Sequence, residues 1–207
     1  MKFLLGGVWL TIELSVIAII LSVVLGLVVA LLGLSERRSL RAANRVYVEV
    51  FRSIPMLVMV LWVYYGLPVV LGLKLGPFMG GVLALALCDS AFEAEIFRGG
   101  IQSIEKGQVE ASRSLGLGHF HTMRYVILPQ ALRRVLPPLG NQFVYMLKMS
   151  SLVSIIGLLE LTRRANELTV TEYRPLEIYT VLVLEYLVLI LVVSYLVRRL
   201  ERRMNVG

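Results

Sequence analysis

Two acidic residues, Asp89 and Glu93, lie four positions apart inside an apolar run. On a helix this spacing puts both carboxyl groups on one face, whereas Glu95, two positions later, faces another side. Ionised carboxylates in such a run would attract an ammonium or a guanidinium, so we predict that Asp89 and Glu93 line a polar path, with helix packing as the alternative. Glu95 lies three positions before Arg98, and we expect an ion pair within the helix.

A second polar group interrupts another apolar run, where Lys148 is followed by Ser150 and Ser151. A cation with neighbouring hydroxyl groups can hold a carboxylate, so we predict that these residues belong to the same path. The alternative is a buried ion pair between Lys148 and either Glu160 or Asp89 that fixes the packing of the helices.

Groupings typical of enzymes and metal centres are missing from the sequence. His119 and His121 have no cysteine or carboxylate at ligand spacing, so we predict no metal site. Cys88 is the single cysteine and is expected to be a small packing residue. The phosphate-binding pattern Gly-x-x-x-x-Gly-Lys-Ser/Thr is also absent from the sequence, so the chain is predicted to hydrolyse no ATP, to be no enzyme and to hold no cofactor of its own.

The composition indicates that the helices which carry these residues lie in a lipid bilayer. Of the 207 residues 57% are hydrophobic and 17% are charged, and the mean hydropathy is +0.79. The formal charge of +7 would suit a nucleic-acid-binding protein, but the arginines punctuate apolar runs and do not cluster with aromatic residues, so no nucleic acid is expected. Because a membrane helix needs about 20 apolar residues, we predict an all-α membrane protein with five spans. The expected spans cover roughly 6–34, 55–73, 78–98, 134–158 and 177–197, the fourth being a candidate broken helix.

The charges in the connections predict the orientation, because Lys and Arg are retained on the cytoplasmic side. The connections 35–52 and 98–134 and the tail from Arg198 are rich in arginine. By contrast, 66–77 carries only Lys74, and acidic residues balance the arginines of 160–177. The amino terminus is therefore expected outside and the carboxyl terminus in the cytoplasm. No repeat or second domain is visible, so residues 1–207 are predicted to form one domain.

The cytoplasmic loop 103–129 is expected to form a bent elbow. The run Glu105–Ser114 is compatible with a helix, Gly116 and Gly118 would permit a sharp turn, and a second short helix is expected to end at Leu128, before Pro129. Apolar side chains would then project at the turn between two arginines. They are Leu115, Leu117 and Phe120, flanked by Arg113 and Arg124.

Several motifs carry a family resemblance. The sequence Glu110-Ala111-Ser112, then Gly116, then Val126-Ile127-Leu128-Pro129, resembles the EAA loop of ABC importer permeases, with Ser112 and Val126 as mild departures. The segments 51–55, 94–104 and 147–152 resemble the polar amino-acid branch of that family. The resemblance covers most of residues 45–165 and implies a type I ABC importer permease fold. Glu160 with the arginines after it is similar to the family's Leu-Thr-Arg segment near the external gate, so we assign Glu160 to the predicted path as well, a solvated outer loop being the competing interpretation.

The resemblance also implies what the chain does and with which partners. It implies the membrane subunit of an ATP-driven importer of polar amino acids in the bacterial inner membrane. The elbow would dock into two ATP-binding-cassette subunits, which would bind ATP and Mg²⁺, and the partners would include a second permease subunit and an extracytoplasmic amino-acid-binding protein. A gradient-driven carrier or channel, or a membrane scaffold without transport, is the alternative function. The sequence leaves open which amino acid is carried and whether the second permease is identical.

Overall fold

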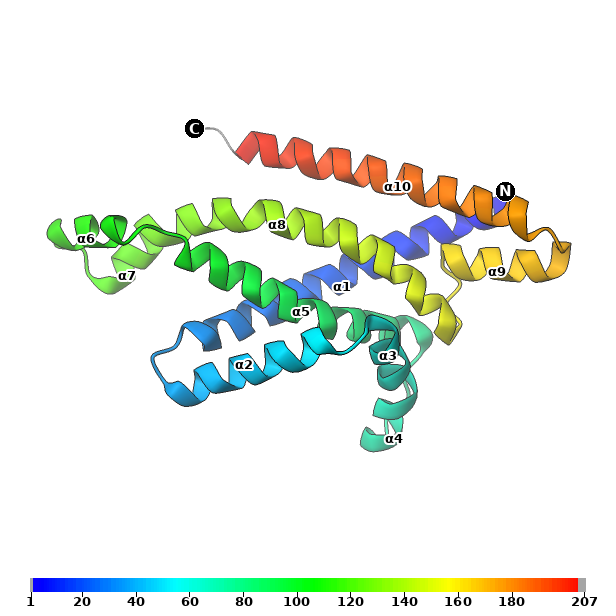
Figure 1. The fold of residues 1–207 in the computed structure, drawn as a ribbon, viewed down its shortest axis with the longest axis horizontal. Helices are drawn as coiled ribbons and strands as arrows, with labels where there is room; N and C mark the ends of the chain where they lie inside the picture. The colour runs from blue at the N-terminus through cyan, green and yellow to red at the C-terminus, as the bar shows by residue number, and fades with distance from the viewer. Residues whose placement is uncertain (1, 205–207) are drawn as a thin grey trace.

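The structure is a computed structural model that describes residues 2–204, and in this range every element of secondary structure is a helix (Figure 1). Ten α-helices, two π-helical segments and one 3-10 segment follow one another along the described chain. They are α1 (Lys2–Leu34), α2 (Arg38–Ser53), α3 (Met56–Leu61), η1 (Trp62–Gly66), α4 (Leu67–Leu71), α5 (Pro77–Gln102), α6 (Lys106–Ser114), α7 (His119–His121), η2 (Thr122–Ile127), α8 (Leu128–Met149), η3 (Ser150–Ile156), α9 (Leu161–Glu172) and α10 (Pro175–Met204).

The pair α1 and α5 forms the centre of the molecule and makes its most extensive helix–helix contact. The two helices approach closely at Gly26, where an added Cβ would lie 2.5 Å from the Cβ of Glu93 and 2.9 Å from the carbonyl oxygen of Ser90. Only a residue without a side chain fits at this crossing. Apolar residues from α1, α3, α5, α8 and η3, among them Leu14, Leu85 and Met146, fill the main core beside it.

The arginine-rich stretch 35–52, expected as a connection, contains the 16-residue helix α2, which lies against α1 and α5 (Figure 1). Its buried side carries Val48 and the ring pair Tyr47–Phe51, whose centroids are 4.5 Å apart. Asn44 Nδ2 also donates to the carbonyl of Val29 at 2.8 Å. Because apolar residues recur at helical spacing, the segment folds as an amphipathic helix in spite of its charge.

The expected second span, 55–73, is short, and it turns sharply away from α2. After Pro55 the chain forms α3, η1 and α4, which lie at 100° to α2 and project from the body of the molecule in Figure 1. In the fourth span α8 changes to the 3-10 segment η3 at Ser150 without a break, and the helix ends at Gly157, which has a φ of 88°; a bend of 48° separates it from α9. Pro137 and Pro138 lie inside α8 without ending it.

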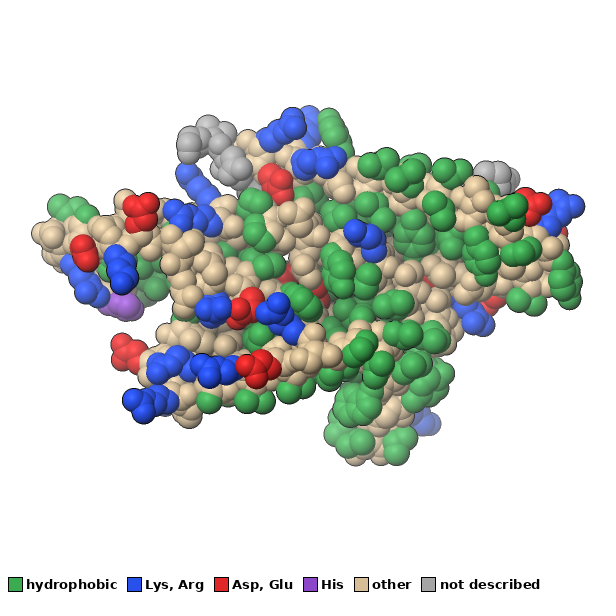
Figure 2. All heavy atoms as spheres, in the orientation of Figure 1, with side chains coloured by type: hydrophobic (Ala, Val, Ile, Leu, Met, Phe, Trp, Pro, Cys, Tyr) green, Lys and Arg blue, Asp and Glu red, His purple; other side chains and the backbone are tan. Residues whose placement is uncertain are grey.

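Two helical stretches, Gly6–Leu34 and Pro175–Arg203, are long and apolar enough to cross a membrane, and four are if each bent pair is one span. The count of five spans therefore stays a prediction. Figure 2 shows hydrophobic side chains over α10 and over the projecting α3 and α4. None of the most apolar window of α10 is buried in the single chain, so this helix is turned toward lipid or another subunit. The expected outer connection 160–177 contains the helix α9.

Candidate path and coupling elbow

Asp89 is the centre of a buried polar cluster that joins α5 to three other helices. Its side chain is fully buried. Ser22 Oγ on α1 donates to Asp89 Oδ2 at 3.1 Å, and Gln142 Nε2 on α8 donates to Asp89 Oδ1. One residue further along α5, the hydroxyl of Ser90 bonds that of Tyr47 on α2 at 2.7 Å. The carboxylate therefore has two donors, so the structure supports a packing role for Asp89.

Glu93 lies on the same face of α5 but has a different hydrogen-bonding environment. Its side chain is also fully buried, but neither carboxylate oxygen has a hydrogen-bond partner among the described residues. An unsatisfied buried carboxyl group is unfavourable and calls for a physical explanation. Of the two acidic residues on the predicted path, Glu93 is the one whose carboxyl oxygens both lack a hydrogen-bond donor in the described chain.

The structure does not gather Lys148, Ser150 and Ser151 into one carboxylate site within the chain. Lys148 is exposed, whereas Ser150 is buried. Ser150 Oγ donates to the carbonyl of Leu147 and Ser151 Oγ to that of Lys148, both at 2.8 Å. The alternative of a buried pair is wrong for this structure, because the Lys148 side chain forms no ion pair within residues 2–204. The assignment of these residues to the path stays a prediction.

Glu160 caps helix α9. Its carboxylate accepts from the backbone N–H of Thr162 at 2.9 Å and of Arg163 at 2.7 Å, and the hydroxyl of Tyr186 on α10 donates to it at 3.0 Å. The side chain is fully buried, so the interpretation as a solvated loop is wrong for this residue. A carboxylate at a helix N-terminus satisfies free backbone donors. The cap explains its burial, and its membership of the path stays a prediction.

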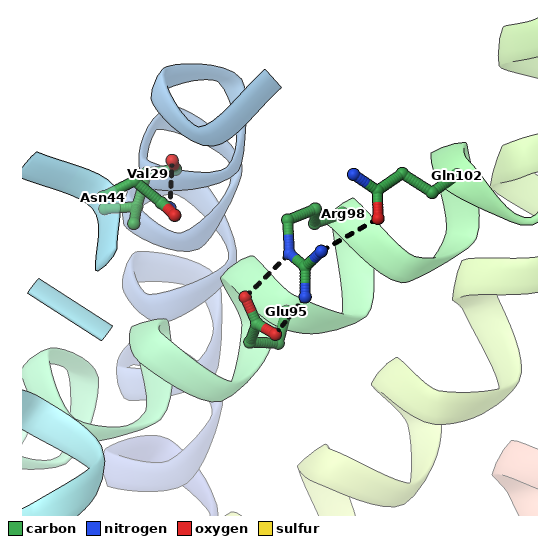
Figure 3. A network of polar contacts seen from close by, with 5 residues as sticks. All are labelled: Val29, Asn44, Glu95, Arg98 and Gln102. Carbon is green, nitrogen blue, oxygen red and sulfur yellow. Dashed lines mark hydrogen bonds and ion pairs between the residues drawn. The ribbon is translucent and has the colours of Figure 1, made fainter. Parts of the chain in front are cut away.

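The predicted ion pair of Glu95 and Arg98 is confirmed. Arg98 Nη2 lies 2.6 Å and Nε 2.9 Å from the two carboxylate oxygens of Glu95, and Arg98 Nη1 donates to Gln102 Oε1 at 2.8 Å. Figure 3 shows the guanidinium between these two acceptors on α5. This pair is held within one helix and does not depend on a partner subunit.

The elbow forms at the predicted place, with one correction. Helix α6 ends at Ser114 and Gly116 makes the turn with a φ of 77°, but Gly118 has an extended backbone and needs no special freedom. The hydroxyls of Ser112 and Thr122, 3.0 Å apart, fasten the two arms. Leu115 and Phe120 are 81% and 67% exposed at the tip, whereas Leu117 is half-buried. Glu110, Ala111 and Arg113 are exposed along α6.

The second arm of the elbow does not stop before Pro129, as the sequence led us to expect. Instead α7, η2 and α8 follow one another directly from His119 to Met149. Proline in a regular α-helix clashes with the carbonyl four residues earlier, here that of Tyr125. The π-helical turn of η2 lies across Tyr125 and changes the local hydrogen-bond spacing, so the helix continues through the proline. The tip is therefore rigidly connected to α8.

The family pattern of the binding-protein-dependent transport system inner membrane component matches residues 22–206. The chain belongs to this family. The "Glutamine transport system permease protein GlnP" of Escherichia coli strain K12 is 41% identical over 207 residues, covering 98% of this permease and 93% of its own length. The "Probable glutamine ABC transporter permease protein GlnM" of Bacillus subtilis strain 168 is 40% identical over 199 residues, covering 96% and 92%.

Solved structures agree with the fold. A chain of an amino acid ABC transporter crystallised with histidines is similar to this permease with a TM-score of 0.91 and 41% identity, covering 98% of this chain and 94% of that one. A chain of the MetNI methionine ABC transporter, at 22% identity, has a TM-score of 0.84 and covers 99% and 97%, which shows the fold alone. The predicted type I ABC importer permease fold is confirmed. As the permease component of an ABC transporter of bacterial inner membranes, the chain is not itself the ATPase.

Some contacts of the polar cluster escape sequence reasoning. Ser22, Gln142, Tyr47 and Tyr186 were not singled out, although each bonds a residue of the buried cluster or of the α9 cap. One signal was present: Ser22 is an isolated polar residue inside an apolar run, where a side chain needs a hydrogen-bond partner, and Gln142 with Asn141 interrupts another.

Proposed function

We propose that this permease carries a polar amino acid inward across the membrane, and that glutamine is the first substrate to test. The observation that carries the proposal is the 41% identity over 98% of the chain to a permease named for glutamine transport. The buried carboxyl group of Glu93 on α5 supports it, because polar side chains inside membrane spans are expensive and usually serve a path.

The proposed assembly contains two ATP-binding-cassette subunits, which bind ATP and Mg²⁺, an extracytoplasmic amino-acid-binding protein and a second permease subunit. The exposed apolar surface of α10 supports a partner in the membrane. We place the amino terminus outside and the carboxyl terminus in the cytoplasm. The elbow and the last turns of α10 lie toward one end of the molecule, and the start of α1 with α9 lies toward the other, which supports this orientation (Figure 1).

The elbow 103–129 couples the permease to the ATPase subunits in this proposal. Leu115 and Phe120 offer two large apolar side chains that the chain itself leaves uncovered. A groove on a soluble partner would bury them, and the continuous helix from His119 to Met149 would transmit the movement of that partner to the membrane.

The test is uptake of radiolabelled glutamine by proteoliposomes that contain the permease, its ATPase subunits and the binding protein. We expect uptake that requires ATP, and we expect Leu115→Ser or Phe120→Ser to reduce it while the permease remains in the membrane. Val170→Ser is the matched control, because Val170 is 69% exposed on α9, away from the elbow. Uptake by the permease alone, driven by an ion gradient, would show a carrier and overturn the proposal.

A further inference from the structure

A charged groove lies between α2 and α5, at some distance from the buried polar cluster. Its volume is about 440 Å³, large enough for a small organic molecule. Figure 2 shows acidic and basic side chains together on this face of the molecule. The residues that line it are Gly33, Arg41, Asn44, Arg45, Val48, Glu49, Arg52, Glu95, Arg98 and Gln102.

The wall formed by α5 is already neutralised. Glu95 and Arg98 bond each other through two hydrogen bonds, and Gln102 takes a third N–H of the guanidinium (Figure 3). Arg41, near one end of α2, donates to the backbone carbonyls of Ser35 and Glu36. These side chains line the groove, but they already form hydrogen bonds within the chain.

The wall formed by α2 carries charges of both signs that remain available. Arg45, Glu49 and Arg52 follow one another at spacings of four and three, so they share one face of the helix. Within the described chain, the side chains of Arg45 and Glu49 enter no hydrogen bond or ion pair, and Arg52 is held over the Phe92 ring at 5.1 Å. A carboxylate between two guanidinium groups is therefore exposed to whatever enters the groove.

Helix α2 also has an apolar flank, on a different face from the charged residues of the groove. Val46 and Val50 lie four residues apart on a different face of α2 and are 61% and 46% exposed. This apolar flank is the side that hydrocarbon would cover. The charged residues Arg45, Glu49 and Arg52 are exposed and lie on a different face of α2 from this apolar flank.

We propose that this groove binds the zwitterion of an amino acid, as a site separate from the buried cluster around Asp89. Glu49 receives the α-ammonium, and Arg45, whose side chain has no partner within the described chain, receives the α-carboxylate, so the site recognises the part that all α-amino acids share. The inference depends on the proposed transport of amino acids and adds a site to it. Charge-assisted hydrogen bonds of both signs favour a zwitterion over a ligand with one charge.

The test is binding of radiolabelled L-glutamine to the permease–ATPase complex in nanodiscs of phosphatidylcholine, without the binding protein. Two competitors separate the charges: an analogue of glutamine that lacks the ammonium group, and one that lacks the carboxylate. For the native complex we expect each analogue to compete at least about tenfold more weakly than glutamine, as loss of a charge-assisted bond predicts. Glu49→Gln should remove the preference over the analogue without the ammonium group, and Arg45→Gln the preference over the analogue without the carboxylate.

Arg38→Gln is the matched control, because Arg38 is an exposed arginine of α2 outside the groove, and it should leave both preferences unchanged. ATP-driven glutamine uptake by the native complex is measured in parallel. If uptake fails, the proposed function fails; if uptake proceeds while Glu49→Gln and Arg45→Gln keep both preferences, the groove proposal alone is refuted. Displacement of glutamine by phosphatidylglycerol in the native complex but not in Arg45→Gln would assign the groove to a lipid headgroup and would also overturn it.

Discussion

The turn of the elbow allows a substitution whose effect arises in the backbone alone. Gly116 has a φ of 77°, and an added Cβ would meet no atom within 4 Å. Gly118, two residues later, also has open space around an added Cβ, but its φ is −67°. Gly116→Ala and Gly118→Ala therefore add the same methyl group in the same turn, and only the first forces a residue with a side chain into the left-handed region.

The expected cost follows from two opposing terms. A residue with a Cβ in the left-handed conformation costs about 1–2 kcal/mol. Replacing glycine by alanine also restricts the unfolded chain, which offsets about 0.4–1 kcal/mol. Gly116→Ala should therefore weaken the elbow by about 1 kcal/mol, a factor of about five in its folded population. Gly118→Ala lacks the first term and should be neutral or slightly stabilising.

Limited trypsin digestion of the reconstituted complex measures this difference, because Lys106 and Arg113 are exposed on α6. We expect faster cleavage at these sites in Gly116→Ala than in Gly118→Ala, together with less glutamine imported per ATP hydrolysed. Equal cleavage and equal coupling in the two variants would refute the reasoning from the turn geometry.

Three further outcomes are expected from the thermal stability of the purified permease. Glu160→Ala should destabilise it by about 1–2 kcal/mol because the N-cap of α9 is lost, and Glu160→Asp should recover part of the loss. Glu93→Leu should leave the melting temperature unchanged or raise it, because it removes a buried carboxyl group whose oxygens accept no hydrogen bond. Asp89→Leu should lower the melting temperature, because two donors lose their acceptor. The opposite order of melting temperatures would contradict the hydrogen-bond assignment. Ser112→Ala should cost about 1 kcal/mol unless combined with Thr122→Val, since the pair then loses both partners together.

Features that depend on neighbours in the sequence could be predicted. The Glu95–Arg98 pair follows from a spacing of three. The change from α-helix to 3-10 helix at Ser150 occurs where a charged residue and two hydroxyl residues interrupt an apolar run. The turn at Gly116 also follows from residue type. These are local decisions of a helix, so a single sequence contains the information.

Features that depend on the relative rotation of helices could not be predicted. The donors of Asp89 come from 67 and 53 positions away, and nothing in the sequence fixes which faces of α1 and α8 meet α5. Helix α2 was missed for another reason, since its many arginines indicated a connection between spans and outweighed the apolar stripe of Val48 and Phe51. Pro129 was misread because the compensating π-helical turn has no sequence signature of its own.

Asp89 and Glu93 show how the rest of a fold can separate two residues that the sequence treats alike. Both are acidic, fully buried and on one face of α5, yet Asp89 has two donors and Glu93 has none among the described residues. A buried carboxyl group without a partner disfavours the arrangement that contains it by about 1–3 kcal/mol. An arrangement of the same helices that brought a donor to Glu93 would be favoured by a similar amount, and Asp89, which already has two donors, would gain less. The unsatisfied residue, not the satisfied one, is therefore the one whose bonding can change as the permease moves.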